Sequence, residues 1–322
     1  MSGKKAKDIM RIVFMGTPEF AVPSLDILVK NKYDVVMVIT QPDKPKGRGH
    51  HVQCSPVKEY AQKNGLPVMQ PKKIGDADII EQLRKLNADL FVTCAFGQLL
   101  TEQVLAIPKY GTVNVHGSLL PKYRGAAPIQ WAIINGDKKT GVTTMLTVLK
   151  LDAGDMLLKE EIEIDDEMTA GQLHDRMSLL GAELLLKTIQ GLKEGTITPE
   201  PQMDCDTCYA PRMTKEVGEI KWGASAREIH NLVRGTNPWP GAYSYINNER
   251  MRVWKTRIIY EDKMTGKKPG TVIEITKDGF LVQTGKGIIL VLEVQCDNAK
   301  KMTVNQYICG HMVKVGDSFG EE

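Results

Sequence analysis

The sequence has 322 residues, of which 42% are hydrophobic and 25% charged, and its formal net charge is +3. This composition is ordinary for a folded globular protein, and the length is sufficient for two domains with full hydrophobic cores. No apolar run approaches the roughly 20 residues that span a bilayer, and no apolar segment of a signal peptide follows the polar, basic residues 1–7. We therefore expect a cytoplasmic protein without a membrane partner.

The chain opens with a strand, a turn and a helix. Residues 11–16 form an apolar run that ends at Gly16, and residues 20–30 carry apolar side chains at helical spacing. A dinucleotide-binding turn requires the pattern Gly-x-Gly-x-x-Gly, and only Gly16 stands there. We therefore expect no NAD and no flavin.

Strands and helices continue to alternate along the following residues. This alternation predicts a Rossmann-like α/β domain at residues 1–195, with a parallel sheet and right-handed crossovers. The predicted strands are residues 34–40, 66–70, 89–94, 112–116, 141–149 and 156–164. The predicted helices are residues 55–63, 76–87, 101–107, 127–134 and 169–192, of which the last is long and amphipathic.

The C-terminal part has a different pattern. Residues 196–211 contain prolines among polar residues and show no period, which predicts a linker. Short runs of strand character then follow, separated by glycine turns, at residues 252–260, 271–276, 279–284 and 288–295. They predict a small antiparallel, OB-like β-barrel at residues 212–322.

The barrel region is the basic part of the chain. Residues 208–322 contain 17 Lys and Arg against 13 Asp and Glu, whereas residues 1–207 contain 25 against 26. A basic barrel suits contact with RNA, although a domain that only stabilises or oligomerises the protein is the alternative. We expect a monomer.

The six cysteines are too scattered for a disulfide framework. Cys205-x-x-Cys208 has the spacing of a metal-ligand pair, yet no second such pair follows to complete four ligands. His50 and His51 are adjacent in one loop and also lack further ligands. We expect reduced thiols and no metal.

The predicted strand at residues 112–116 carries two side chains that could act together. Asn114 and His116 are two residues apart, so a strand places the amide and the imidazole on the same face. Gly117 ends this strand and opens a loop whose backbone can approach a ligand closely. This is the layout of a site at the carboxyl edge of a parallel sheet.

The same stretch resembles a known family. Residues 114–121, followed by Arg124-Gly125, resemble the signature of formyltransferases that use 10-formyltetrahydrofolate, and residues 151–155 resemble the segment that holds the family's aspartate. Further stretches are similar to the methionyl-tRNA formyltransferase family, namely residues 16–20, 40–45, 47–49, 55–58 and 237–240. The resemblance spans nearly the whole chain.

The resemblance implies roles for particular residues. The implied catalytic group is Asn114, His116 and Asp152. The implied folate site is lined by Ser118, Leu119, Leu120 and Pro121, and the turn that borders the pterin by Phe96 and Gly97. Phe96 stands where the family often has Tyr, and the ring and the neighbouring glycine are kept.

The loop between the second strand and its helix is unusually long. Residues 41–51 are rich in Pro and Gly, whereas crossovers of this kind usually have about 2 to 6 residues. The resemblance implies that its cations, Lys44, Lys46 and Arg48, contact the acceptor end of initiator tRNA. A solvated surface loop is the alternative.

These residues suit one reaction. When a formyl group moves from a folate nitrogen to an amine, a tetrahedral centre forms whose oxygen gains negative charge, and Asn114 and His116 can donate to it. Asp152 would stabilise the imidazole's charge or relay a proton. An α-amino group with a pKa of about 8 is partly free base near neutral pH, so no enzyme nucleophile is required.

The resemblance therefore implies transfer of formyl from 10-formyltetrahydrofolate to initiator methionyl-tRNA. The central signature is shared by formyltransferases that act on sugar-nucleotide amines, which are the alternative acceptors. A protein that only binds RNA would leave the intact catalytic group unexplained.

Overall fold

The computed structural model describes residues 9–46, 51–311 and 313–320 of the chain. The chain divides into two compact units, and the division does not follow the sequence in order. The first unit comprises residues 1–125, 141–162 and 174–209, and the second comprises residues 126–140, 163–173 and 210–322. Within the described ranges, no helix is both long and apolar enough to cross a membrane.

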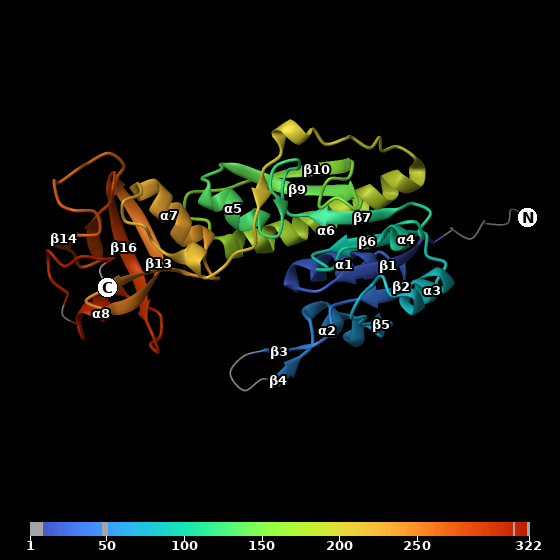
Figure 1. The fold of residues 1–322 in the computed structure, drawn as a ribbon, viewed down its shortest axis with the longest axis horizontal. Helices are drawn as coiled ribbons and strands as arrows, with labels where there is room; N and C mark the ends of the chain where they lie inside the picture. The colour runs from blue at the N-terminus through green and yellow to red at the C-terminus, as the bar shows by residue number, and fades with distance from the viewer. Residues whose placement is uncertain (1–8, 47–50, 312, 321–322) are drawn as a thin grey trace, which may run out of the picture. The chain divides into compact units, whose positions relative to one another are not determined.

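The first unit is built on a seven-stranded sheet with the strand order β10-β9-β7-β6-β1-β2-β5 (Figure 1). The strands are β1 (Arg11–Gly16), β2 (Asp34–Ile39), β5 (Val68–Met69), β6 (Leu90–Cys94), β7 (Thr112–His116), β9 (Lys139–Leu146) and β10 (Met156–Glu163). The five strands from β7 to β5 run parallel, which confirms the predicted parallel sheet, while β9 is antiparallel to β7.

The central strands are apolar because both of their faces are covered. Every residue of β6 is buried, and in β1 only Arg11 is exposed, as expected for strands in the middle of a parallel sheet. The helices that accompany the sheet are α1 (Val22–Lys30), α2 (Pro56–Lys63), α3 (Ala77–Lys85), α4 (Glu102–Leu105) and α6 (Ala170–Glu194). Helix α2 begins where the sequence predicts, because the Ser55 hydroxyl accepts a hydrogen bond from the Lys58 amide.

The long crossover loop contains a hairpin. Strand β3 (Lys44–Lys46) pairs antiparallel with β4 (His51–Gln53), and the two strands project from the unit in Figure 1. Asp43 fixes the base of this arm, because its carboxylate pairs with Lys58 and accepts a hydrogen bond of 2.8 Å from Gln70 Nε2. These contacts, with Lys58 first, hold the pKa of the Asp43 carboxyl below its usual value.

The second unit contains an antiparallel sheet with the order β12-β13-β16-β15-β14, and β17 pairs with β16. The strands are β12 (Ala242–Ile246), β13 (Glu249–Tyr260), β14 (Val272–Ile275), β15 (Phe280–Gln283), β16 (Ile288–Cys296) and β17 (Met302–Thr303), and helix α8 (Val304–Ile308) follows. Residues near the end of the described chain connect the two edge strands of this sheet, because Phe319 bridges Ile246, the last residue of β12, and Ser318 bridges Thr271, which directly precedes β14. This antiparallel sheet, connected at both edges, confirms the predicted OB-like barrel.

Two helices complete the second unit. Helix α7 (Ala226–Gly235) begins with a capping box, in which Ser225 and Glu228 bond each other's backbone amides, and it packs against α5 (Pro128–Ile134). His230 and Arg234 of α7 are buried and bond backbone carbonyls of residues 165–168. The short stretches 126–140 and 163–173 therefore belong to the packing of this unit.

Candidate active site

The carboxyl ends of three adjacent parallel strands meet at one edge of the first unit. The chain runs through β1, β2 and β5 on one side of the sheet and returns through β6 and β7 on the other, so the strand order reverses between β1 and β6. Such a reversal leaves a crevice at the carboxyl edge. The Thr17 hydroxyl, after β1, donates to the carbonyl of Phe96, after β6, over 3.0 Å. Asn114 and His116 lie on the neighbouring strand β7, as the sequence predicts.

Asn114 presents its amide nitrogen. In the register of β6 and β7 it lies opposite Thr93, whose hydroxyl donates to Asn114 Oδ1 over 2.9 Å. This bond fixes the orientation of the amide, and Nδ2 has no acceptor within the described ranges. Because Asn114 is only half-buried, the two Nδ2 hydrogens remain available to a ligand.

Both ring nitrogens of His116 have a defined environment. The side chain is buried, and Nε2 lies 2.9 Å from the Tyr123 carbonyl oxygen. A carbonyl oxygen can only accept, so Nε2 carries a hydrogen and donates it. Nδ1 faces Asp152, with 3.7 Å between Nδ1 and Oδ2. The structure thus brings together two of the three predicted catalytic residues.

Asp152 is held by the backbone. Its Oδ2 accepts a hydrogen bond of 2.8 Å from the Gly125 amide, and its side chain is only 13% exposed. Asp152 also has a φ of 47°, a left-handed conformation that costs a residue other than glycine roughly 1 kcal/mol or more. Surrounding contacts must therefore hold this backbone in place.

The residues predicted to line the folate site differ in exposure. Ser118 and Leu120 are buried, and the Ser118 hydroxyl donates to the Lys122 carbonyl over 2.6 Å. Leu119 and Pro121 are half-buried, so their side chains are the ones of this stretch that can reach a ligand. Ser118 and Leu120 shape the loop from within the protein.

The predicted pterin turn lies after β6. Phe96 is buried, and its carbonyl also accepts from Gln41 Nε2 over 3.3 Å. Gly97 has a φ of 84°, a conformation that favours glycine, and a Cβ at this position would lie in van der Waals contact with the Gln41 side chain.

Two of the three predicted tRNA-contacting cations lie on the hairpin arm. Lys44 and Lys46 are residues of β3, so this part of the predicted loop is strand. Arg48 lies outside the described residues.

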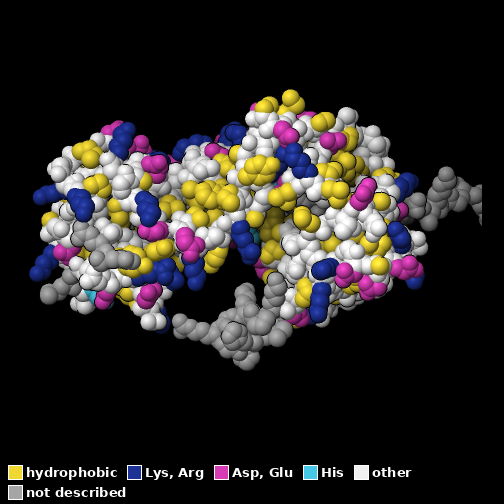
Figure 2. Space-filling view, viewed as in Figure 1, with side chains coloured by type: hydrophobic (Ala, Val, Ile, Leu, Met, Phe, Trp, Pro, Cys, Tyr) yellow, Lys and Arg dark blue, Asp and Glu magenta, His cyan; other side chains and the backbone are white. Residues whose placement is uncertain are grey.

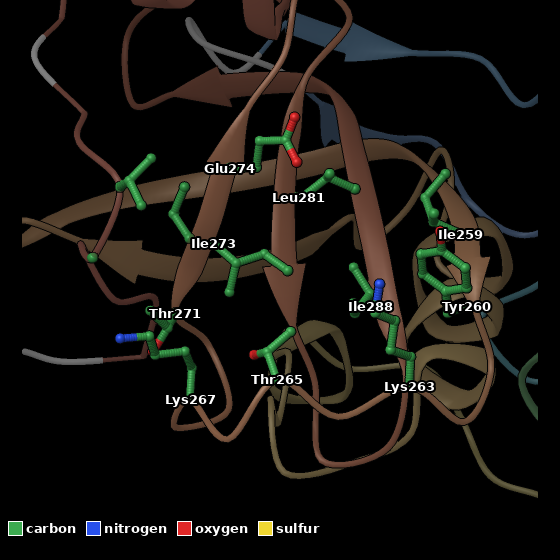
Figure 3. A pocket seen from close by; sticks show the side chains of 13 residues that line it. Ile259, Tyr260, Lys263, Thr265, Lys267, Thr271, Ile273, Glu274, Leu281 and Ile288 are labelled. Carbon is green, nitrogen blue, oxygen red and sulfur yellow. The ribbon is translucent and has the colours of Figure 1, made fainter.

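A second concave surface lies on the barrel (Figure 3). This barrel groove has a volume of about 540 Å³ and is lined mainly by β13, β14, β15 and the loop around residue 265. Lys263 and Lys267 lie at one end of it and Glu274 at the other, with apolar side chains between. Lys263 Nζ lies 4.5 Å from the centre of the Tyr260 ring, and Tyr260 is 48% exposed. An exposed ring beside cations is the arrangement that proteins use for nucleic-acid bases and phosphates.

Charge on the barrel face seen in Figure 2 is mixed rather than concentrated in one patch. Lys and Arg side chains are spread over it, with Asp and Glu between them. Within the second unit, Glu249, Cys296 and His311 each place one potential metal-ligand atom within 4.8 Å of the others. Burial raises the pKa of the Cys296 thiol, which disfavours the thiolate that binds metals.

Several residues around the site were not predicted from the sequence. Thr93 orients Asn114, the Tyr123 carbonyl binds His116, and Gln202 bonds the loop of Asp152. Tyr123 and Gly125 lie inside the recognised signature, so their neighbourhood could be found. Gln202 lies in the stretch predicted as a linker, and no spacing or composition marks it.

Comparison with known proteins agrees with this geometry. The sequence matches the family described as formyl transferase over residues 10–189 and the C-terminal domain of formyl transferases over residues 212–312.

Solved structures share the fold. An N-formyltransferase from Helicobacter canadensis, in complex with folinic acid and dTDP-3-aminofucose, matches with a TM-score of 0.67 and 22% identity, over 88% of this chain and 99% of that one. HypX from Aquifex aeolicus, in complex with tetrahydrofolic acid, matches with a TM-score of 0.61 and 16% identity, over 96% and 50% of the two chains. The fold and the site thus define a formyl transferase.

Curated relatives narrow this class. A methionyl-tRNA formyltransferase of Acetivibrio thermocellus is 54% identical over 97% of this chain and 100% of its own length. A methionyl-tRNA formyltransferase of Clostridioides difficile is 50% identical over 95% and 99% of the two chains. The chain belongs to the methionyl-tRNA formyltransferase family.

Proposed function

We propose that the chain transfers the formyl group of 10-formyltetrahydrofolate to the α-amino group of methionine esterified to initiator tRNA. The observation that carries the proposal is the position of Asn114 and of the His116–Asp152 pair at the end of β7, in a chain whose relatives are named for this activity. The folate-bound fold neighbours support a formyl-folate as the donor.

Asn114 is assigned to stabilise the negative charge that develops on the formyl oxygen. When the lone pair of the amine attacks the formyl carbon, the formyl oxygen becomes an oxyanion, and Nδ2 of Asn114 donates to it. Because the Thr93 hydroxyl holds Oδ1, the amide needs no reorientation during the reaction. Removal of such a preorganised donor typically raises the barrier by about 3 to 4 kcal/mol.

His116 and Asp152 are assigned to the transfer of the proton from the amine to the folate nitrogen. The attacking amine must lose a proton, and the folate nitrogen must gain one as its bond to the formyl carbon breaks and the carbonyl re-forms. Since the Tyr123 carbonyl accepts the Nε2 hydrogen, Nδ1 is the ring nitrogen that takes up the amine proton, and only after this protonation can it donate to the oxyanion or to the folate nitrogen. The Asp152 carboxylate stabilises the positive ring across 3.7 Å.

Two regions would contact the nucleic acid. Lys44, Lys46 and Arg48 are assigned to the acceptor end of the tRNA, the end that carries the reacting amine. Lys263 and Lys267 of the barrel groove are assigned to phosphates. Residues 1–195 then act as the catalytic domain, and residues 212–322 as the tRNA-contacting domain, on either side of the stretch 196–211.

A transfer assay tests this function. Purified protein is supplied with radiolabelled 10-formyltetrahydrofolate and, in parallel, with initiator methionyl-tRNA and with a 4-amino sugar nucleotide. We expect label on methionyl-tRNA at a kcat/KM at least about 100-fold above that for the sugar. Label on the sugar nucleotide and none on methionyl-tRNA would overturn the proposal.

A further inference from the structure

The side chain of Gln202 is fully engaged beside the active site. Its Nε2 donates to the carbonyl oxygens of Asp152 and Gly154, each over 2.8 Å, and its Oε1 accepts from Arg124 Nε over 2.9 Å. A primary amide has two N–H donors, and both are used here. Gln202 therefore fixes the left-handed backbone of Asp152 from outside the loop.

The partner of Gln202 is a buried cation. Arg124 is 1% exposed, and its Nη1 pairs with Asp204 Oδ1 over 2.9 Å. A buried guanidinium is costly unless it is hydrogen-bonded, so these contacts are strongly favoured once the chain has folded. Lys150 and Arg124 together hold the pKa of the Asp204 carboxyl below its usual value. Arg124 immediately precedes Gly125, whose amide holds the Asp152 carboxylate.

The other end of the same stretch reaches the opposite side of the imidazole. Cys208 Sγ accepts a hydrogen bond of 3.2 Å from the Tyr123 amide, and the Cys208 carbonyl accepts one of 3.0 Å from the Arg124 amide. The Tyr123 carbonyl in turn accepts from Nε2 of His116. One end of residues 202–208 thus holds the partner of Nδ1, and the other end holds the partner of Nε2.

We propose that residues 202–208 act as a clasp that sets the position of both His116 partners, with Gln202 and Cys208 as positioning residues for formyl transfer. The proposal rests on the proposed function for its kinetic tests. Neither residue touches the reacting atoms in this assignment. Their contribution is to keep the Asp152 carboxylate and the Tyr123 carbonyl in register with the ring, because a displacement of about 1 Å can cost 100-fold in rate.

Gln202→Leu tests one end of the clasp, because leucine has a similar size and no polar atoms. We expect kcat to fall about 10- to 100-fold, while KM for folate and for tRNA changes less than about 3-fold. Gln295→Leu is the matched control: in the barrel, Gln295 Oε1 accepts from Trp254 Nε1 over 2.9 Å, and its Nε2 donates to the Ala299 carbonyl over 2.8 Å. This control should lower the unfolding temperature and leave kcat unchanged. Equal kcat values for the two variants would overturn the proposal.

Cys208 tests the other end. Cys208→Ala removes the acceptor of the Tyr123 amide and should lower kcat several-fold, whereas Cys208→Ser keeps an acceptor and should restore most of the rate. Cys205→Ala is the control, since Cys205 is, like Cys208, an exposed free thiol of the same stretch, whereas the Tyr123 amide bonds Cys208. A serine variant as slow as the alanine variant, or an alanine variant as fast as wild type, would show that Cys208 does not position the ring.

A measurement without substrate separates this inference from the proposed function. The ¹⁵N resonances of the His116 ring, assigned with a His116→Gln variant, report which nitrogen carries the hydrogen. We expect the Nε2–H tautomer in the wild type, and displaced ring resonances in Gln202→Leu and Cys208→Ala but not in Gln295→Leu. Displaced resonances in a protein that formylates nothing would overturn the function and keep the clasp, whereas unchanged resonances would overturn the clasp alone.

Discussion

The end of β7 and the barrel groove are built on opposite principles. At the end of β7, His116 is buried and the Asp152 side chain is only 13% exposed, and their hydrogen bonds go to backbone groups of a short loop. In the barrel groove, Lys263, Lys267 and Tyr260 are exposed side chains that line the surface.

The difference follows from what each region must do. A bond-breaking step gains only from groups that already stand in the transition-state geometry, so burial and fixed partners are useful there. Recognition of a charged polymer gains from cations that reach phosphates and release counterions, and exposure is then useful. Substitutions should therefore affect kcat at the first region and the salt dependence of binding at the second.

The largest effect should come from the end of β7. Asn114→Ala, His116→Ala and Asp152→Ala should each lower kcat by about 100-fold or more, because each removes a preorganised group from the transition state. Folate binding, measured by equilibrium titration of the folded variants, should persist. Near wild-type turnover in any one of them would remove that residue from the assigned mechanism.

Substitution of Arg48 should have an intermediate effect on selectivity. Arginine can form planar, bidentate hydrogen bonds that lysine cannot copy, so Arg48→Lys should keep the charge and lose recognition. We expect the ratio of kcat/KM for initiator over elongator methionyl-tRNA to fall about 10-fold. Lys46→Arg, which also keeps the positive charge, is the comparison. An unchanged ratio in Arg48→Lys and Arg48→Ala would assign discrimination elsewhere.

The barrel groove should show a smaller and less selective effect. The double substitution of Lys263 and Lys267 by Gln should raise KM a few-fold for initiator and elongator tRNA alike. The slope of log affinity against log salt concentration should flatten by about one for each phosphate that the variant no longer neutralises. Substitution of Lys277 by Gln, a barrel cation that does not line the groove, is the control. Equal slopes for the wild type and the double variant would contradict the phosphate assignment.

The smallest effect concerns stability against pH. Burial lowers the pKa of His230 below its ordinary value near 6.5. Its Nε2 donates to the Asp166 carbonyl over 2.7 Å, and its Nδ1 accepts from the Thr256 hydroxyl. The unfolded chain therefore binds more protons, and this contribution to stability is lost as pH falls below about 6.5.

His230→Gln should accordingly flatten the fall of the urea unfolding midpoint between pH 7 and pH 5. Between pH 7.5 and pH 9, where the imidazole is neutral in both states, the variant and the wild type should show the same pH dependence. A parallel fall of both proteins below pH 6.5 would show that other groups dominate acid unfolding.

The features that could be predicted are those that depend on local sequence pattern. Apolar runs predict the strands β1 and β6, and alternation of apolar and polar residues predicts the strands of the barrel. The spacing of Asn114 and His116 places both side chains on one face of β7. Gln202 could not be found in this way, because its role arises only when a stretch far along the chain returns to residues 152–154. Likewise β9 continues the sheet antiparallel to β7, a direction that the order of strands and helices does not specify.

The second unit is assembled from three separate stretches of the chain, and this limits where the enzyme can be cut into independent parts. Residues 212–322 alone would lack the stretches 126–140 and 163–173, and with them helix α5 and the carbonyls that bond His230 and Arg234. A cut in the stretch 196–211 would therefore expose one side of α7, including a guanidinium deprived of its backbone acceptors. Exchange of the C-terminal part between related enzymes, in the laboratory or by recombination, should succeed only when these two distant stretches are exchanged with it.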